Sequence, residues 1–401
     1  MDGEPAFKRI LVIAPTPFFA DRGCHVRILG EIKALQSLGC VVQVCTYHLG
    51  RDVEGIATIR TVNIPWYRKL SAGPSVHKVY IDLLLLWIVL RACKSFRPNI
   101  IHAHLHEGIV IGKLASLWYG IPMVADLQGS LTEEILDHGF LPRWRWLVGL
   151  VRWIEKKVNE MPRHLITSAS RTTQLVTEKF GVTDVSTIGD GVDLDVFYRR
   201  PEDLELKTKL GIAHEDKVVV FIGVLTGYQG IDLLLDAAVL VLEEVPTAKF
   251  LIIGFPEEAY REKAASMGLR EHVIFTGKIA YADAPRYLSL GSVSVSPKVS
   301  TSEANLKLFT YMAMGLPSVV FDNLVNREIL GDLGVYAENG EVVAFAKMIV
   351  GLLRDSERAR QLGEDCYRKA SSAYSWEAVG YRLREVYETY ASDRELVAKG
   401  G

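Results

Sequence analysis

The sequence predicts an α/β protein built from two Rossmann-like, doubly wound parallel-sheet domains that face a central cleft. Short β-branched runs alternate with longer helical patterns along most of the chain, which is typical of parallel sheets covered by helices on both faces. The alternation stops near Phe197 and restarts near Val218, so it forms two series of similar rhythm. A length of 401 residues also suits two or three domains.

The first series predicts an N-terminal domain over residues 1–198. Helical patterns such as His25–Leu38 and Gly108–Tyr119 fill the gaps between its strands. The expected strands are Ile10–Ala14, Val41–Thr46, Thr58–Val62, Ile100–His102, Met123–Asp126 and Leu165–Thr167.

A charged segment that contains Pro201 follows, and we interpret residues 199–214 as a linker. The second series predicts a C-terminal domain over residues 215–375. Its expected strands are Val218–Ile222, Phe250–Ile253, Val273–Phe275, Val293–Ser296 and Val319–Phe321. The stretch 376–391 exceeds what this domain needs, so we expect a final helix that packs back on the N-terminal domain.

Composition and charge exclude several classes of protein. Lys and Arg total 46 and Asp and Glu total 48, and this net charge of −2 argues against a nucleic-acid partner bound by bulk positive charge. The five cysteines have neither zinc-site nor C-x-x-C spacing, which favours a reducing cytoplasm. The longest apolar run, Leu83–Leu90, is far shorter than the about 20 residues of a membrane span. We expect a cytoplasmic protein without a signal peptide.

Polar residues follow several strands of the first series, at the edge where ligands of open α/β sheets bind. Gly23 precedes a helix start, where glycine lets the backbone approach an anion, although a plain turn is the alternative. His102, His104 and His106 alternate along one strand end. Same-face side chains about 6.6–6.8 Å apart rarely enclose one ion. We therefore expect them to line a substrate cleft, and we expect no metal.

Two segments of the second series combine a loop with a helix start. Tyr228-Gln229-Gly230 follows the first strand of this series and its closing Gly223. A Ser/Thr/Glu-rich segment after Lys298 opens a helix that ends at Gly315. We expect the backbone N–H groups at the start of this helix to point into the cleft.

These segments, in this order, resemble the family-4 retaining glycosyltransferases, which have the GT-B fold. The resemblance extends from about residue 9 to residue 390, nearly the whole chain. The matching residues are Gly23, Asp190-Gly191-Val192-Asp193 with Phe197, Gly223, Gln229-Gly230, and Met312-Ala313-Met314-Gly315-Leu316-Pro317. A periplasmic binding protein would not be expected to carry this set.

The resemblance implies transfer of a sugar from a nucleotide-sugar donor to an acceptor hydroxyl. It further implies retention, a metal-independent front-face mechanism and no cofactor. The N-terminal domain would bind the acceptor and the C-terminal domain the donor. The implied catalytic residues are Lys307, His104, Gln128 and Asp126. The implied donor-binding residues are Gly23, Gly223, Gln229, Gly230, Lys298, Ser302, Glu303, Asn305, Leu306 and Thr310.

The chain departs from the family pattern at charged positions, as a divergent branch would. The family's Arg and Lys fall on Val224 and Gln229, and its Glu-x7-Glu pair falls on Ser302 and Thr310. The family's histidine falls on Gln128. Candidate replacement cations are Lys298, Lys307, Arg22 and Arg27, of which Lys307 is favoured because it lies on the first turn of the motif helix.

Two other functions stay open. The lost charges are consistent with a catalytically silent GT-B scaffold or regulatory partner. A sugar-nucleotide epimerase would convert the donor without an acceptor.

Residues 140–157 combine aromatic residues with a basic stripe. The segment holds three of the seven tryptophans, and Arg145, Arg152 and Lys156 share one side of the helical wheel. This pattern suits a helix that lies on a membrane surface, although plain packing on the sheet is the alternative. The expected acceptor is a glycan, a polysaccharide precursor or a lipid-linked molecule, and a peripheral position on the inner face of the cell membrane would follow.

Overall fold

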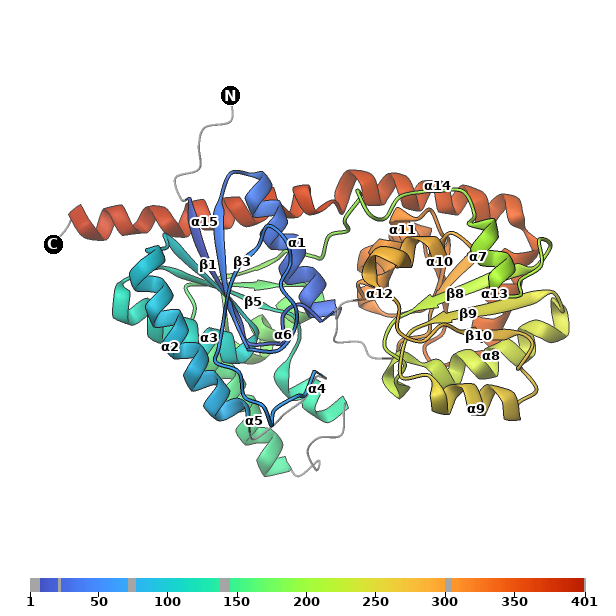
Figure 1. Ribbon diagram of the computed structural model, residues 1–401, viewed down its shortest axis with the longest axis horizontal. Helices are drawn as coiled ribbons and strands as arrows, with labels where there is room; N and C mark the ends of the chain where they lie inside the picture. Colours follow the sequence, from blue (N-terminus) through green and yellow to red (C-terminus); the bar gives the residue numbers. More distant parts are fainter. Residues whose placement is uncertain (1–7, 21–22, 71–76, 138–144, 300–304, 400–401) are drawn as a thin grey trace. The chain divides into compact units, whose positions relative to one another are not determined.

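The computed structural model describes residues 8–20, 23–70, 77–137, 145–299 and 305–399. Contacts divide the chain into two compact units (Figure 1). Of the described residues, those up to 191 and those from 376 onward form the N-terminal unit, and those in 192–299 and 305–375 form the C-terminal unit. Each unit has a parallel sheet with helices on both faces. Within the described ranges, no helix is both long and apolar enough to cross a bilayer.

The N-terminal unit contains a seven-stranded sheet with the order β3-β2-β1-β4-β5-β6-β7. All of its strand pairs are parallel. The strands are β1 (Arg9–Ala14), β2 (Val41–Thr46), β3 (Ala57–Arg60), β4 (Ile100–His104), β5 (Met123–Leu127), β6 (His164–Thr167) and β7 (Val185–Thr187). The central strands β4 and β5 are buried along their whole length because helices cover both faces.

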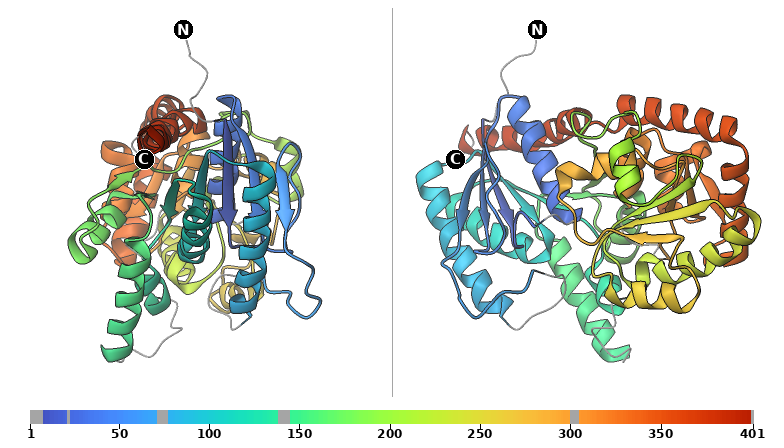
Figure 2. Two further views of the ribbon diagram at one scale, coloured as in Figure 1. Left: turned by 90° about the vertical axis from the view of Figure 1, so that its left-hand side faces the viewer. Right: turned by 45° about the vertical axis from the view of Figure 1, so that its right-hand side comes forward.

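Two groups of helices enclose this sheet (Figure 2). The apolar cluster on one face includes side chains of α1 (Gly23–Ser37) and α15 (Trp376–Lys399). The cluster on the other face includes side chains of α2 (Lys78–Phe96), α3 (Leu105–Tyr119), α5 (Arg145–Asn159) and α6 (Ser170–Phe180). A short helix, α4 (Leu131–Asp137), precedes α5.

Helix α15 lies against α1 and belongs to the N-terminal unit. The two helices meet through small residues, because a Cβ on Gly30 would fall 2.0 Å from the ring of Trp376. Similarly, a Cβ on Gly380 would lie 2.9 Å from Ala34 Cβ. The small residues let the indole of Trp376 reach the sheet-facing cluster.

The C-terminal unit contains a six-stranded parallel sheet with the order β10-β9-β8-β11-β12-β13. Its strands are β8 (Lys217–Ile222), β9 (Ala248–Ile253), β10 (Val273–Phe275), β11 (Val293–Ser296), β12 (Ser318–Phe321) and β13 (Val335–Ala337). One face packs on α8 (Ile231–Glu244), α9 (Glu258–Ser266) and α13 (Val342–Arg354). The other packs on α7 (Leu204–Lys209), α10 (Ala284–Leu288), α11 (Lys307–Ala313), α12 (Leu324–Leu330) and α14 (Ser356–Ala373).

The segment interpreted as a linker has structure of its own. Residues 199–214 contain α7, which Asp203 caps by accepting a hydrogen bond from Leu206 N–H at 2.9 Å. Leu206 and Ile212 are buried in the core of the C-terminal unit. The charged composition of the segment led to its interpretation as a linker, although these two apolar residues attach it to the core.

Candidate functional site

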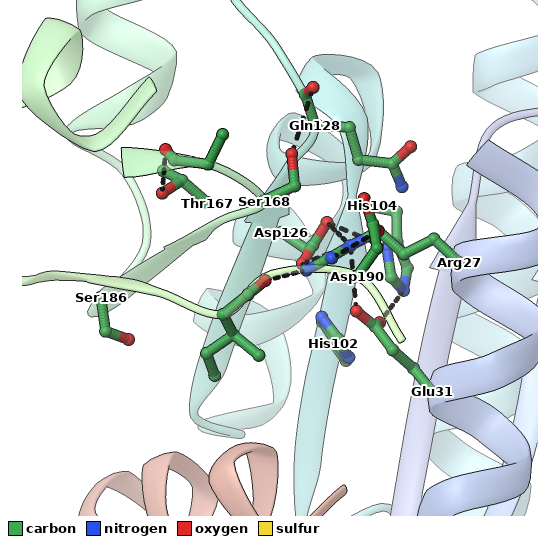
Figure 3. A network of polar contacts seen from close by, with 12 residues as sticks. Arg27, Glu31, His102, His104, Asp126, Gln128, Thr167, Ser168, Ser186 and Asp190 are labelled. Carbon is green, nitrogen blue, oxygen red and sulfur yellow. Dashed lines mark hydrogen bonds and ion pairs between the residues drawn. The ribbon is translucent and has the colours of Figure 1, made fainter. Parts of the chain in front are cut away.

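Arg27 is the centre of a buried polar network in the N-terminal unit (Figure 3). Its guanidinium comes from α1 and reaches the carboxyl end of β5, where Nη2 lies 2.5 Å from Asp126 Oδ2 and Nε lies 3.1 Å from Asp126 Oδ1. Nη1 donates to Asp190 Oδ1 at 2.8 Å, and Nη2 donates to the carbonyl of Ile188 at 3.0 Å. Arg27 therefore joins α1, β5 and the segment after β7.

Two histidines and Glu31 complete this network. His104 Nε2 lies 3.6 Å from Glu31 Oε2, and His104 Nδ1 lies 3.7 Å from Asp126 Oδ1. His102 Nδ1 shares a hydrogen bond of 2.6 Å with the hydroxyl of Tyr387 on α15. Strand register places the two histidines beside β5, because His104 pairs with Asp126.

The environment of the network shifts the pKa values of its members. Burial alone would raise the pKa of Asp126, but the contacts with Arg27 and His104 outweigh it and hold that pKa well below its ordinary value. Burial raises the pKa of Glu31 well above its ordinary value, and the attraction of Arg27 only partly opposes this shift. Burial also lowers the pKa of His102 well below its ordinary value. Folding thus favours the protonated form of Glu31 and the neutral form of His102.

Metal-ligand atoms gather within this same network. Glu31, His102, His104 and Asp126 each offer an atom, and these atoms lie within 4.8 Å of one another. The guanidinium of Arg27 already neutralises Asp126 and lies 3.0 Å from Glu31 Oε1, so a cation bound among these atoms would be repelled by it. The donor set therefore suits a charge-balanced internal network better than an ion site.

The third histidine of the strand end lies apart from the other two. His106 Nε2 lies 3.8 Å from Glu155 Oε1, whose carboxylate also accepts a hydrogen bond from Leu131 N–H at 2.9 Å. The backbone leaves the extended conformation at Leu105, which has a φ of +62°. The alternating pattern expected for an extended strand ends at that residue, and α3 begins.

The predicted catalytic residues of the N-terminal unit differ in accessibility. His104 and Asp126 are fully buried and contact other side chains of the network. Gln128, just beyond β5, is half-buried, and its amide nitrogen has no hydrogen-bond partner among the described residues. Gln128 is therefore the least buried member of this group, although its amide nitrogen, like the ring nitrogens of His104, is itself buried without a hydrogen-bond partner in the described part of the chain.

The loop after β1 is ordered by a histidine that sequence reasoning missed. Ala20 N–H donates to His25 Nδ1 at 2.9 Å, so His25 Nε2 carries the ring proton and donates to Thr16 Oγ1 at 2.7 Å. Gly23, the predicted anion-binding glycine, is the first residue of α1. Arg22, a candidate replacement cation, lies outside the described residues.

In the C-terminal unit, Lys307 lies at the end of β8 beside two other predicted residues. Its Nζ donates to Gln229 Oε1 at 2.6 Å and lies 5.1 Å from the ring centroid of Phe221. A Cβ on Gly223 would lie 3.3 Å from Lys307 Cε. The structure therefore brings Lys307 beside Gly223 and Gln229, although Lys307 lies 78 residues beyond Gln229 in the sequence.

Gly230 lets the loop that carries Gln229 pack closely on the segment after β11. Its φ is +76°, and a Cβ at this residue would fall 1.9 Å from the carbonyl oxygen of Pro297. The neighbouring contact is a hydrogen bond of 3.3 Å from Val299 N–H to Tyr228 O. Lys298 lies within this packed segment and is only 3% exposed.

The start of α11 is held by buried amides. Asn305 Nδ2 donates to Ser296 Oγ at 3.0 Å and to Asn326 Oδ1 at 2.8 Å. The side-chain amide of Asn305 thus makes its hydrogen bonds within the C-terminal unit, at the residue directly before Leu306 and α11. The helix starts at Lys307, later than the sequence indicates, and Thr310 is half-buried on it. The predicted Ser302 and Glu303 lie outside the described residues.

Tyr311 and Asn326 are further residues that sequence reasoning did not select. The hydroxyl of Tyr311 accepts from Ile222 N–H at 2.9 Å and donates to Val295 O at 3.2 Å, so it ties the ends of β8 and β11 together. Burial raises the pKa of Tyr311, which keeps it a neutral donor. Tyr311 lies inside the motif helix, and this position is the sequence feature that could have identified it as a site residue.

Comparison with known families and structures identifies the type of protein. A model of a glycosyl transferase 4-like domain matches residues 22–189, and a model of group 1 glycosyl transferases matches residues 216–355. A phosphatidyl-myo-inositol mannosyltransferase from Mycobacterium leprae is 26% identical over 403 residues, which covers 97% of this chain and 99% of that protein. Sulfoquinovosyl transferase SQD2 from Arabidopsis thaliana is 24% identical and covers 93% of this chain and 72% of that protein.

Solved structures share the fold. Sucrose-phosphate synthase from Thermosynechococcus elongatus superposes with a TM-score of 0.79 at 18% identity, over 98% of this chain and 100% of that one. Anabaena HepE in complex with UDP-glucose superposes with a TM-score of 0.74 at 18% identity, over 95% of this chain and 99% of that one. Two parallel-sheet units of the GT-B type, matched by the two domain models in the expected order, show that the chain belongs to the family-4-like glycosyltransferases.

Proposed function

We propose that this chain is a retaining glycosyltransferase of the hexosyltransferase type that moves a sugar from a nucleotide-sugar donor to an acceptor hydroxyl without a metal ion or cofactor. One contact carries the proposal: the Lys307 ammonium lies 2.6 Å from the side chain of Gln229, where the family resemblance places a lysine. The cation missing at Gln229 is thus supplied by another element. The related structures of HepE with UDP-glucose and of starch synthase IV with ADP support a nucleotide-linked donor.

Lys307 would act by stabilising the leaving diphosphate. Unit charges 4 Å apart attract by about 4 kcal/mol at an effective dielectric near 20, which is enough to favour departure of the leaving group. Its present partner is the neutral amide oxygen of Gln229, and a phosphate oxygen is a stronger acceptor for an ammonium. The acceptor hydroxyl would attack from the face on which the diphosphate leaves, so no protein nucleophile is needed.

The remaining predicted residues divide between binding and positioning. We assign donor binding to the C-terminal unit, where Gly223 and Gly230 let the backbone lie close to Lys307 and Pro297. We assign acceptor binding to the N-terminal unit, where the half-buried Gln128 lies just beyond the carboxyl end of β5. His104 and Asp126 are buried with Arg27, so they would act as positioning residues for the strand end that carries Gln128.

The test is transfer of labelled sugar from a panel of nucleotide sugars. Lys307→Ala should lower turnover by about 100-fold or more, the scale of removing one donor that stabilises the transition state. Lys347→Ala changes an exposed lysine on α13 and should leave turnover unchanged. Near-normal turnover of Lys307→Ala would contradict the assignment.

We propose a lipid-linked or glycan-precursor acceptor, and a peripheral membrane contact through residues 140–157. The mycobacterial relative is named for phosphatidyl-myo-inositol, which supports an acceptor carried by a lipid. The described part of the segment exposes Trp146, Leu150 and Trp153 on α5. Residues 140–144 lie outside the described residues.

A catalytically silent partner protein is the second candidate, and a specific observation favours it. The positions of the family's Arg, Lys and second Glu are occupied by Val224, Gln229 and Thr310, none of which is charged. In that case Lys307 and Gln229 would satisfy each other structurally. A folded protein that binds no nucleoside diphosphate would support this candidate over the transferase.

A further inference from the structure

Helices α2, α3 and α5 form one side of the N-terminal unit (Figures 1 and 2). Their outward faces carry large exposed apolar side chains. Helix α3 contacts α2 on one flank and α5 on the other. All three pack on the same face of the sheet. Their outward faces therefore lie side by side, and we call this surface the three-helix face.

Exposed apolar side chains on α2 recur at the helical period. Val79, Leu83 and Trp87 are four residues apart, and all are at least half exposed. The inward residues of the same helix, such as Ile81 and Leu85, are fully buried in the core. Helix α2 thus presents two apolar faces, although only one is needed for packing.

The other two helices repeat the same spacing. On α3 the exposed stripe consists of Val110, Leu114, Leu117 and Trp118, opposite the buried Ile109 and Ala115. On α5 it consists of Trp146, Leu150, Trp153 and Ile154. These three helices hold half of the large exposed apolar side chains among the described residues of the chain.

Tryptophan is concentrated at this surface. Of the six tryptophans among the described residues, five are at least half exposed, and four of these lie on α2, α3 and α5. The fifth, Trp66, donates from Nε1 to the hydroxyl of Tyr80 on α2 at 3.1 Å, so it borders the same surface. Tryptophan favours the boundary between water and lipid, where its ring is apolar and its N–H meets polar groups.

The charge of the three helices is strongly positive. They carry eight basic residues and three acidic ones, for a net charge of +5 in a chain whose total is −2. The basic residues are Lys78, Arg91, Lys94, Lys113, Arg145, Arg152, Lys156 and Lys157.

Each of the three acidic side chains is engaged inside the protein. Asp82 accepts from the hydroxyl of Tyr47 at 2.6 Å, and Glu107 accepts from Lys78 at 2.5 Å. The fully buried Glu155 accepts from Leu131 N–H at 2.9 Å.

Three of the basic residues are paired as well, Lys78 with Glu107, and Lys156 and Lys157 with Glu160 directly after α5. The surface that remains for a partner is apolar, and its basic residues include Arg91, Lys94, Lys113 and Arg152.

We propose that the three-helix face docks on an anionic lipid surface, with α2 and α3 contributing as much as α5. The inference deepens the membrane contact proposed for residues 140–157 and rests on that part of the proposed function, not on sugar transfer. Lipid is favoured over a second copy of the chain because a symmetric dimer through this face would oppose two strongly positive surfaces. Apolar side chains with basic neighbours match acyl chains beneath anionic headgroups.

The test is flotation of the full chain with vesicles at low salt. Wild type should float with phosphatidylcholine vesicles that contain phosphatidylglycerol and not with phosphatidylcholine alone. The triple reversal Arg91→Glu, Lys113→Glu and Arg152→Glu should weaken binding by about 10-fold or more, since each basic residue near the surface contributes to attraction. Lys347→Glu on α13 is a single charge reversal away from this face and should bind as wild type does.

Three substitutions of exposed leucines test the contribution of each helix to membrane binding. Leu83→Ser, Leu117→Ser and Leu150→Ser remove one exposed leucine from each helix, and each should weaken flotation, whereas the exposed Leu324→Ser in the C-terminal unit should not. Thermal unfolding checks that all variants are folded.

Three outcomes would overturn the proposal: no flotation of wild type, flotation that the α2 and α3 variants leave unchanged, or a dimer in lipid-free solution that the same variants dissociate. Nucleoside-diphosphate binding by the C-terminal unit is measured on the same samples. This measurement distinguishes failure of the membrane-docking proposal from failure of the transferase assignment.

Discussion

At the scale of single residues, the Arg27 network explains why buried charges are tolerated in the N-terminal unit. One guanidinium binds the carboxylates of Asp126 and Asp190, while folding favours the protonated form of Glu31. Sequence reasoning selected His104 and Asp126 because polar residues at strand ends are informative. It could not pair them with Arg27, because that contact spans 99 residues and depends on the strand order.

The protonation of Glu31 predicts an unusual pH dependence. A folded-state pKa above the value of 4.5 for an exposed Glu gives stability that is complete below pH 4.5 and is lost as pH rises. Glu31→Gln imitates the protonated acid, so it should be more stable than wild type at pH 8 and similar at pH 4.5. The gain is about 1.4 kcal/mol for each unit of pKa elevation. Denaturant unfolding across this pH range measures it.

Glu107 provides the matched control. Its ion pair with Lys78 outweighs the effect of burial and lowers its pKa, so its contribution is present above pH 4.5 and is lost as pH falls. Glu107→Gln should therefore lower the free energy of unfolding at pH 8. If Glu31→Gln lost stability at pH 8 as well, Glu31 would be ionised in the folded protein and the account of the network would be wrong.

At the scale of elements, most strands were predictable from the sequence, and the two that were not, β7 and β13, are short strands at the sheet edges. Central strands such as β8 are continuous apolar runs, because both faces of a parallel sheet are covered. Strands β7 and β13 have three residues each, too few for a periodic pattern to appear, whereas the equally short β10 was recognised because its three residues, Val273–Phe275, are all apolar. The turn glycine Gly230 was recognised from the motif, but its contact with Pro297 required the fold.

The close contact between Gly230 and Pro297 predicts that a methyl group added at Gly230 lowers the stability of the protein. Gly230→Ala places a Cβ 1.9 Å from Pro297 O at a φ of +76°, so both strain and a backbone clash result. Gly268→Ala has the same φ but open space around the new methyl, so it isolates the strain, about 1–2 kcal/mol. Thermal unfolding should show a clearly larger loss for Gly230→Ala. Equal losses would mean that the loop does not pack closely on Pro297.

At the scale of the whole molecule, the small net charge conceals an uneven distribution. A total of −2 excludes binding to polyanions by bulk charge, yet three helices of the N-terminal unit carry +5. The sequence indicated the helix within 140–157 because its aromatic and basic residues are adjacent. The matching stripes on α2 and α3 become evident only when buried and exposed residues are distinguished, because both helices are apolar nearly all round.

The central claim is that the C-terminal unit binds the diphosphate of a nucleotide-sugar donor through Lys307. Calorimetric titration of the folded wild-type chain with UDP, GDP, ADP and dTDP tests it most directly. We expect saturable binding of at least one of the four, weakened about 10-fold or more in Lys307→Ala and unchanged in Lys347→Ala. Absence of binding by all four would contradict the account and favour a silent partner protein.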